Sequence, residues 1–408
     1  MRAARPRGRE LPALELTAEQ QAVVEAIGAG TGALLVTGRA GTGKSTLLEH
    51  VVATTGRRVA VCAPTGVAAL NVGGQTIHSL FRLPVGLIGP TRLRQDEATL
   101  KVLNALDVLV IDEVSMVSAD LLDAVDRSLR QARGDRSPFG GVQVVLFGDP
   151  FQLAPVPGGP EEREYYAAAY RSMWFFDAHV WEEAQLTVHE LGLIHRQRDE
   201  DFRRLLTAVR HGRVTAEMAA RLNGMGARPL PAEPPLTLAG RNDRVAAINR
   251  RALARLPGDA KVAHAAVDGD FGGRNLPADE ELHLKPGAHV MLLRNDPDGR
   301  WVNGSTGVVT RIRPNVVSVE VAGVEHDVLP TVWERHRYRY VAERNELQRE
   351  VVAQFTQLPL RLAWAVTIHK AQGTTLEGLY LARPLTPRDV IVDEDVRRFL
   401  RERRQRVA

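Results

Sequence analysis

The chain has 408 residues, of which 44% are hydrophobic and 25% charged, and its formal net charge is +4 at pH 7. These proportions are typical of a globular protein with roughly two or three domains. No apolar run reaches the ~18 residues of a membrane span, and the N-terminal residues lack the apolar segment of a signal peptide. We therefore expect a cytoplasmic protein without a membrane anchor, and the small positive charge leaves its partners open.

The N-terminal region predicts a basic arm followed by a helix. Residues 1–14 are expected to be disordered. In the stretch LTAEQQAVVEAI that follows, apolar residues recur at helical spacing, and Thr17 precedes them as a candidate N-cap. Gln20, three residues further on, completes a capping box.

Four short apolar runs rich in branched residues follow, and each ends in Gly, Pro or Asp: GALLVTG, RRVAVCAP, LDVLVID and VQVVLFGD. Such runs, separated by helical segments, are typical of a parallel sheet that is covered on both faces. The first half of the chain is therefore predicted to be α/β. The single cysteine, Cys62, lies in the second run, where we expect it to act as a small buried hydrophobe.

The second half changes in character along the chain. Helical patterns resume in DEDFRRLLTAVRHG, after a break rich in proline and glycine. Between residues 241 and 350, short strand-like runs alternate with Gly and Asn turns, which indicates a small β-rich insertion. A final α/β-like stretch, LPLRLAWAVTIHKAQG, follows the insertion.

The stretch GRAGTGKST, which begins at Gly38, matches the pattern G-x-x-x-x-G-K-[ST] between an apolar strand and a helix. Glycines at 38, 41 and 43 would let the backbone wrap around phosphate groups, whose charge also favours the N-terminus of the next helix. Lys44 would reach the β- and γ-phosphates, and Ser45 would bind Mg²⁺. The sequence thus predicts a nucleotide site.

Two adjacent carboxylates, Asp112 and Glu113, end the buried strand LDVLVID and form a Walker B pattern. Charge at such a place is costly unless a metal ion or water compensates it. Asp112 would hold Mg²⁺ through water, and Glu113 would act as the general base. Taken alone, this pair is more often a helix cap, so the interpretation depends on the preceding phosphate loop.

A further strand ends in VVLFGDPFQLAPV and presents Gln152, an uncharged group suited to sensing a γ-phosphate. This stretch resembles helicase motif III. Together with APTGVAALNVGGQTIHSLF, IDEVSM, SPFGGVQVVLFGD, HRQRDEDFRRLL and LAWAVTIHKAQG, it makes the chain resemble the superfamily 1B DNA helicases of the PIF family, relatives of RecD. The resemblance covers nearly all of the chain after residue 14.

The resemblance implies two RecA-like P-loop domains with parallel sheets and a small inserted β-rich, SH3-like domain. The implied ranges are 15–160 for the first motor domain, about 82–102 for its strand-separating wedge, 161–240 with 351–408 for the second motor domain, and 241–350 for the insert.

It also implies the site residues. Nucleotide contacts are expected at Gln20, Gly38, Gly41, Thr42, Gly43, Lys44, Ser45 and Thr46, the metal at Ser45 and Asp112, and catalytic roles at Lys44, Glu113, Gln152 and Arg196. DNA contacts are expected at Pro64, Thr65, His78, Phe81, His369 and Lys370. Single-strand tracks combine backbone contacts with groups that meet a base face, but an aromatic residue in the position of Phe81 is as often part of a core.

The expected activity is that of an ATP-dependent DNA helicase that uses Mg²⁺. It would move from five-prime to three-prime on single-stranded DNA, act in replication, repair or recombination, and engage junctions of single- and double-stranded DNA as a monomer.

One element of the family pattern is missing. After Gly373 the chain passes almost directly into LEGLYLARPL, so motif VI, which carries an arginine that stabilises charge on the γ-phosphate, is absent. The gap would be a few dozen residues, from a deletion between short repeats or an error of sequence assembly. Arg383 and Arg388 lie downstream, but the family pattern leads that region away from ATP. The alternative to an active helicase is therefore a remnant that binds nucleotide and single-stranded DNA with little turnover.

Overall fold

The structure, a computed structural model, describes residues 16–30, 32–84, 86–90, 93–157, 159–193, 199–226, 236–239, 242–269, 271, 276–341, 344, 346–367, 387–389 and 392–407. Three sets of predictions lie outside these ranges: the basic arm at 1–14, Arg196, and the segment with His369, Lys370, Arg383 and the predicted gap at motif VI. No helix in the described part of the chain is long and apolar enough to cross a membrane.

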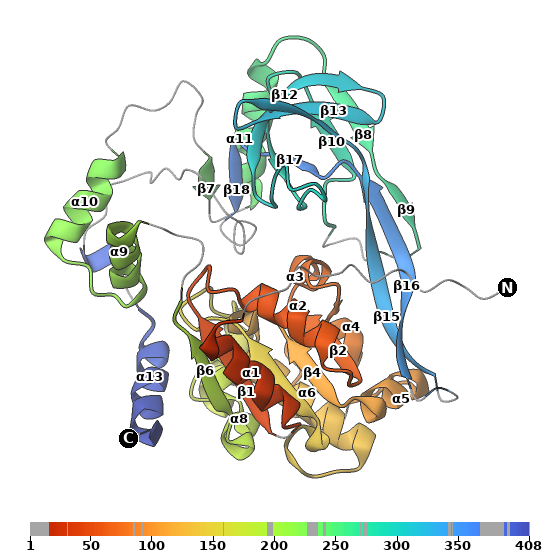
Figure 1. Ribbon diagram of the computed structural model, residues 1–408, viewed down its shortest axis with the longest axis vertical. Coiled ribbons are helices and arrows are strands. Elements are labelled where there is room, and N and C mark those ends of the chain that lie inside the picture. The colour runs from red at the N-terminus through yellow and green to blue at the C-terminus, as the bar shows by residue number, and fades with distance from the viewer. Residues whose placement is uncertain are drawn as a thin grey trace.

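The first half forms a six-stranded parallel sheet, as the four apolar runs predict (Figure 1). Its strands are β1 (Ala33–Gly38), β2 (Val59–Ala63), β3 (Gln75–Thr76), β4 (Val108–Ile111), β5 (Gln143–Phe147) and β6 (Thr187–Leu191), in the order β3-β2-β4-β5-β1-β6. The strands β1, β4 and β5 are buried along their whole length, since helices cover both faces. Because β6 joins this sheet, the sheet continues past residue 160, where the sequence places the domain end.

Helices pack on both faces of this sheet, so that successive residues of a strand are buried under different helices. The helices and 3₁₀ turns are α1 (Ala18–Gly28), α2 (Lys44–Thr54), α3 (Gly66–Asn71), α4 (Ile77–Phe81), α5 (Glu97–Ala105), η1 (Val114–Met116), α6 (Ala119–Arg133), η2 (Pro138–Gly141), α7 (Pro160–Ala169), η3 (Phe175–Asp177) and α8 (His179–Ala184). Leu34 and Val36 of β1 pack with α1 and α2, whereas Leu35 packs with the core under α5 and α6. The predicted capping box of Thr17 and Gln20 is present at α1.

Three buried aspartates on one face of α6 connect neighbouring loops to the helix. Asp120 accepts hydrogen bonds from the backbone N–H groups of Ile88 (2.8 Å) and Gly89 (3.1 Å), within the predicted wedge region. Asp126 accepts one from Phe139 N at 2.6 Å. Burial raises the pKa of both carboxyl groups. Asp120, Asp123 and Asp126 recur every three residues and so share one face of α6, about one turn apart. Each carboxylate can therefore bind a different segment that crosses this face.

The β-rich part of the chain comprises a five-stranded antiparallel sheet and a long hairpin. The five strands are β11 (His289–Leu292), β12 (Thr306–Arg313), β13 (Val316–Val321), β14 (Val324–Val328) and β17 (Leu360–Leu362), in the order β14-β13-β12-β11-β17. β15 (Thr331–Val341) and β16 (Glu346–Gln357) form the hairpin, β9 (Ala266–Asp268) pairs with β16, and β8 (Lys261–His264) pairs with β10 (Glu281–Leu284). Since β16 and β17 extend beyond residue 350, the β-rich part is longer than its predicted range.

The hairpin β15–β16 runs from the β-rich part along the side of the first sheet to α5 (Figure 1). There the hydroxyl of Tyr338 accepts a hydrogen bond from Val61 N at 3.0 Å. This N–H lies near the edge of the first sheet, because the neighbouring strand β3 pairs only with Cys62 and Ala63. The hairpin thus covers a sheet edge that would otherwise present an unpaired donor.

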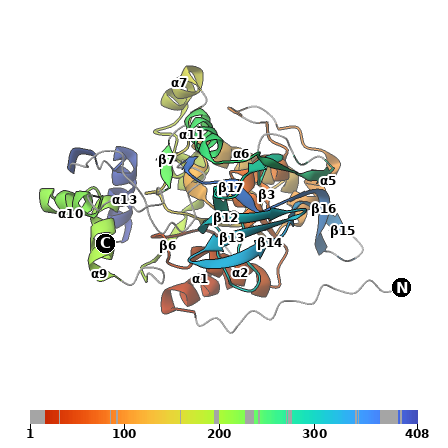
Figure 2. The same ribbon diagram turned by 90° about the horizontal axis from the view of Figure 1, so that it is seen from above.

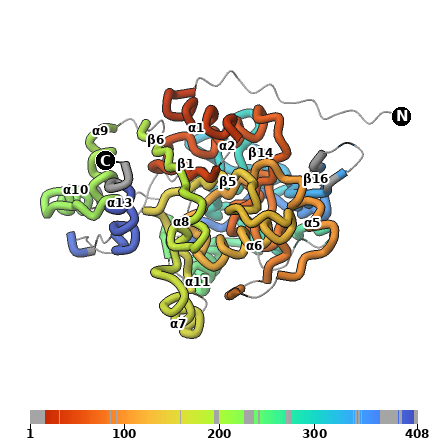
Figure 3. The backbone as a smooth tube through the Cα atoms, turned by 90° about the horizontal axis from the view of Figure 1, so that it is seen from below, coloured from red at the N-terminus to blue at the C-terminus, as the bar shows by residue number. Residues whose placement is uncertain are grey.

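The remaining elements are α9 (Glu200–Arg210), α10 (Ala216–Gly226), β7 (Thr237–Ala239), α11 (Asn242–Arg255), β18 (Ala365–Thr367), η5 (Pro387–Asp389) and α13 (Glu394–Val407). Of these, α11 packs against the β-rich part, where Leu253 belongs to the core. β7 and β18 pair in parallel, as expected for a second α/β unit. Figures 2 and 3 agree that α9, α10 and α13 lie together at one end of the molecule. The ring of Phe399 on α13 stacks on Phe176 at 4.5 Å and so joins the first core.

Replacing Asp123 with Asn should destabilise the fold. Its carboxylate accepts hydrogen bonds from Tyr170 Oη (2.9 Å), His179 N (3.2 Å) and Val180 N (3.0 Å). An amide cannot accept at both positions, so a buried donor loses its partner, at a cost of about 1–3 kcal/mol. Urea unfolding measures the loss. Glu97→Gln, at an exposed carboxylate of α5, is the control and should change stability little. Equal unfolding midpoints for the two variants would contradict the expected role of Asp123.

Candidate functional site

The predicted phosphate loop lies between β1 and α2, in the predicted context. Gly41 and Gly43 have φ values of 83° and 82°, a left-handed conformation that glycine adopts at little cost. Lys44 Nζ donates to the carbonyl oxygens of Gly38 (2.6 Å) and Arg39 (3.1 Å). Thr42 Oγ1 donates to the same Arg39 oxygen at 2.9 Å. The loop is therefore closed around the Lys44 ammonium group.

This loop can hold an anion. Backbone N–H groups and the positive end of the helix dipole meet at the N-terminus of α2, which begins at Lys44. Burial lowers the pKa of Lys44, whereas the negative charges of Asp149 and Glu113 raise it. A side chain at position 38 would not fit, because a Cβ there would lie 2.7 Å from the backbone oxygen of Leu191. The close approach of β6 thus accounts for Gly38.

Carboxylates gather beside the loop at the ends of β4 and β5. Because β5 lies between β4 and β1 in this parallel sheet, the carboxyl ends of the three strands meet at one edge. Burial raises the pKa of Asp112, and the positive charge of Lys44 lowers it. Glu113 has a φ of 51°, a left-handed conformation that is rare for a residue with a side chain. Such backbone conformations concentrate at functional sites.

The donor set at this edge suits Mg²⁺. A serine hydroxyl and a carboxylate are hard oxygen ligands, and Mg²⁺ usually takes one or two protein ligands together with phosphates and water. Within the described ranges, no cluster of three or more His, Cys, Asp or Glu residues can hold a metal. Ser45 and Asp112 therefore fit a metal that arrives with a nucleotide better than a site built by the protein alone.

The other predicted nucleotide residues occupy different environments. Thr46 is exposed on α2, and Gln152 is half-buried in a turn where its N–H bonds to the Asp149 carbonyl oxygen at 2.9 Å. Gln20 is buried, and its side-chain oxygen accepts from Thr17 N at 3.0 Å in the capping box. An adenine contact at Gln20 stays a prediction.

The predicted DNA residues differ in their exposure. Pro64, Thr65 and His78 are half-buried, and the Thr65 hydroxyl caps α3 by accepting from Ala68 N at 3.2 Å. Burial lowers the pKa of His78. Phe81, by contrast, is 0% exposed and belongs to the core of the first sheet. Because its ring is packed inside this core, it cannot stack on a base. The prediction of a DNA contact at Phe81 is therefore wrong.

Two contacts that the sequence did not predict connect α9 to the phosphate loop. Arg39 Nη1 donates to Thr207 Oγ1 at 2.8 Å, and Arg210 Nη2 donates to Asp149 Oδ1 at 2.7 Å. The partners are 168 and 61 residues apart in the chain. In this arginine-rich chain no local pattern singles out these arginines, so their role emerges only from the tertiary fold.

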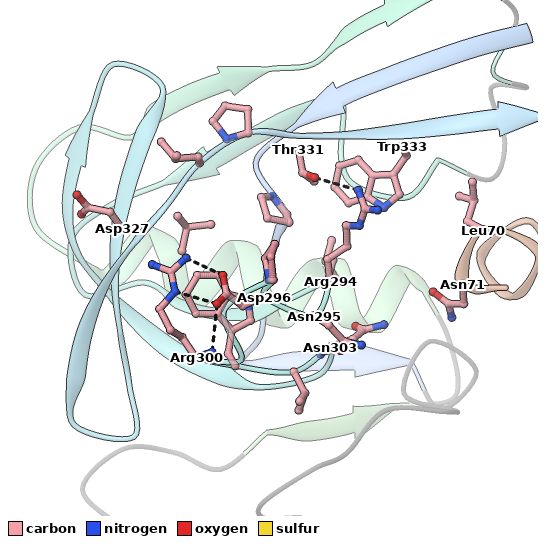
Figure 4. A pocket seen from close by; sticks show the side chains of 18 of the residues that line it. Leu70, Asn71, Arg294, Asn295, Asp296, Arg300, Asn303, Asp327, Thr331 and Trp333 are labelled. Atoms are coloured by element: carbon pink, nitrogen blue, oxygen red, sulfur yellow. Dashed lines mark hydrogen bonds and ion pairs between the residues drawn. The ribbon is translucent and has the colours of Figure 1, made fainter. Parts of the chain in front are cut away.

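A hollow of about 1250 Å³ lies between the first sheet domain and the β-rich part (Figure 4). Leu70 and Asn71 of α3 line one side, and Arg294, Asn303 and Trp333 line the other. The Arg294 guanidinium is 5.9 Å from the centre of the Trp333 ring and donates to Val332 O at 2.7 Å. An arginine beside an aromatic ring is the kind of surface on which single-stranded nucleic acid binds. Sequence reasoning missed this hollow because its walls come from distant segments.

A parallel sheet whose glycine-rich loop leads into a helix, with carboxylates at the ends of two nearby strands, defines a P-loop nucleotide-binding protein. Comparison with known families narrows this class. Residues 15–220 match the family PIF1-like helicase, and residues 274–312 match the 2B domain of DNA helicase Pif1. The chain belongs to the PIF1-like helicase family.

Individual relatives agree with this assignment. The ATP-dependent DNA helicase PIF1 of Danio rerio is 35% identical over 383 residues, which cover 90% of this chain and 56% of that protein. The ATP-dependent DNA helicase Pif1 of Bdellovibrio bacteriovorus is 30% identical over 381 residues, which cover 90% of this chain and 82% of that protein. The chain thus spans little more than half the length of the vertebrate relative.

The fold is also similar to that of a solved helicase. The structure of Bacteroides sp Pif1 in complex with ADP-AlF4 has a TM-score of 0.90 and 32% sequence identity, and the match covers 96% of this chain and 98% of that one. The structure of Bacteroides Pif1 bound to ssDNA has the same identity and coverage but a TM-score of 0.68. The predicted α/β architecture with an added β-rich part is therefore confirmed.

Replacing Gly148 with Ala should damage the nucleotide site. A Cβ at this position, at the end of β5, would lie 2.8 Å from Val114 Cγ1 and 3.0 Å from Val114 N, so η1 and the adjacent Glu113 must shift. We expect a lower melting temperature and weaker binding of a fluorescent ATP analogue, both measurable by titration and thermal scanning. Gly28→Ala is the control, because nothing lies within 4 Å of its added Cβ. Unchanged nucleotide affinity in Gly148→Ala would show that this close packing does not support the site.

Proposed function

We propose that this protein is an ATP-dependent DNA helicase that moves along single-stranded DNA from five-prime to three-prime. The observation that carries the proposal is the group of charges, half-buried or buried, at the carboxyl ends of β1, β4 and β5 and centred on Lys44. The names of the relatives at 35% and 30% identity support the same activity. Replication, repair and recombination are the processes in which such an activity would serve.

Each residue of the site has a role in the proposed hydrolysis. Lys44 and the N–H groups of the loop would bind the phosphates, while Ser45 and Asp112 would hold Mg²⁺. Glu113, at the strained turn after β4, would take a proton from the attacking water. Gln152 and Arg196 are proposed to contact the γ-phosphate, and for Arg196 the proposal rests on the sequence alone.

Single-stranded DNA is the proposed track. Bacteroides Pif1 has been solved bound to ssDNA, and the hollow beside Arg294 and Trp333 has the cation and aromatic face that such a strand uses. The lower TM-score against the DNA-bound structure, 0.68 rather than 0.90, supports a different arrangement of the parts when DNA is bound. Pro64, Thr65, His78, His369 and Lys370 remain proposed contacts.

The other expectations also remain proposals from the sequence: binding of junctions between single- and double-stranded DNA, a monomeric state and a cytoplasmic location. The alternative activity, a remnant that binds but does not turn over, rests on the absent motif VI. The similarity to Bacteroides Pif1 over 98% of that chain favours the active helicase.

The first experiment measures ATP hydrolysis and fork unwinding by the purified chain, beside Lys44→Ala. The expected result is hydrolysis that single-stranded DNA stimulates and that Lys44→Ala lowers by about 10²-fold or more, because the phosphates lose their cation. Lys261→Ala is the matched control, since this lysine is exposed on β8, outside the predicted motor domains and the wedge. Tight binding of ATP and DNA without turnover in the unmodified protein would favour the remnant instead.

A further inference from the structure

A buried ion pair joins α9 to the end of β5. Arg210 Nη2 lies 2.7 Å from Asp149 Oδ1, and the two side chains are only 12% and 4% exposed. Removing two charges from water is expensive, and the attraction between them often fails to compensate for the loss. A buried pair is therefore weak evidence for stability, and its position next to Lys44 points to another purpose.

One face of α9 directs Arg210 toward the phosphate loop. Arg203, Thr207 and Arg210 follow one another at intervals of four and three residues and so share a face of the helix. Thr207 accepts the hydrogen bond from Arg39, the second residue of the loop, at 2.8 Å. Two independent contacts, one to the loop and one to Asp149, therefore hold this face of α9 against the nucleotide site.

The guanidinium of Arg210 has an N–H group that is available for a further hydrogen bond. It lies 4.2 Å from the centre of the Phe151 ring, which fixes its plane, and Nη2 bonds to Asp149. Its Nε is buried and has no hydrogen-bond partner within the described part of the protein. Burial is the main cause of the lowered pKa of Lys44, and the positive charge of Arg210 adds to it.

We propose that Arg210 is a catalytic arginine for the proposed ATP hydrolysis, held by Asp149 so that its guanidinium contacts the γ-phosphate. This inference rests on the proposed function and adds a residue to it. In the reaction the oxygen of water bonds to the γ-phosphorus, the bond from phosphorus to the β–γ bridging oxygen breaks, and ADP keeps that electron pair. The water proton passes to Glu113. Arg210 stabilises the negative charge that spreads over the γ-phosphate oxygens, for which preorganised cations are suited.

Arg210 is well placed among the arginines considered for this role. Arg388 is exposed, and Arg196 and Arg383 lie outside the described residues. Asp149 acts as a positioning residue, because it orients the guanidinium without touching the nucleotide. The arrangement also couples the two halves of the chain, since α9 follows the first sheet and its arginine belongs to the site.

The test compares Arg210→Ala and Arg210→Lys with the unmodified chain in two measurements. Calorimetry gives the affinities for ADP and for ADP with aluminium fluoride, a mimic of the transferring phosphoryl group, both with Mg²⁺. Single-turnover hydrolysis on single-stranded DNA gives the chemical rate. We expect Arg210→Ala to leave ADP affinity unchanged and to lower both the aluminium fluoride affinity and the rate by about 10²–10³-fold. Arg210→Lys should recover part of the loss.

Arg204→Ala is the matched control on the same helix, because its side chain is 71% exposed and pairs with Glu200. It should match the unmodified chain in every measurement.

Equal losses of affinity for ADP and for ADP with aluminium fluoride would overturn the proposal and assign Arg210 a docking role. If Arg210→Ala does not fold, Asp149→Asn gives the answer, since a misoriented arginine should lose aluminium fluoride affinity selectively. An unmodified chain without ATP turnover would overturn the proposed function, whereas turnover that survives in Arg210→Ala would overturn this inference alone.

Discussion

The group of charges at one edge of the first sheet is the constraint on which the rest of this structure depends. Burial lowers the pKa of Lys44, and the negative charges of Asp149, Glu113 and Asp112 beside it oppose this effect. Asp149 is buried, and the other three side chains are half-buried. Charges in such a place must compensate one another or bind something charged. The parallel order of β4, β5 and β1 brings them together, because the carboxyl ends of parallel strands share an edge.

Segments from distant parts of the chain converge on the first domain. The face of α9 contacts the phosphate loop and Asp149, α13 stacks Phe399 on Phe176, and the hairpin β15–β16 brings Tyr338 to the edge of β2. Each contact joins a part of the chain that lies beyond residue 199 to the first sheet. The first sheet is therefore in direct contact with both α9 and the hairpin of the β-rich part.

Residues that are close in sequence differ in their exposure to solvent. His78 and Phe81 belong to the same short helix, α4, yet His78 is half-buried and Phe81 is completely enclosed. The hollow is lined instead by Trp333 on β15, which lies beside Arg294 and is itself mostly buried. The hollow is thus lined from both the first sheet domain and the β-rich part, by residues that no single motif contains.

Local sequence determined the elements whose signals are short in range. The phosphate loop, the buried strands β1, β2, β4 and β5, and the capping box at Thr17 follow from glycine spacing, branched apolar runs and capping chemistry, each read within a dozen residues. Packing alone decided which strand completed the sheet, which aromatic side chain lines the hollow and which of many arginines pairs with Asp149. These outcomes depend on contacts between distant segments, such as Asp149 with Arg210, and sequence periodicity carries no information about them. The physical reason is that an arginine has the same local preferences on an exposed helix as on one that packs against a phosphate loop.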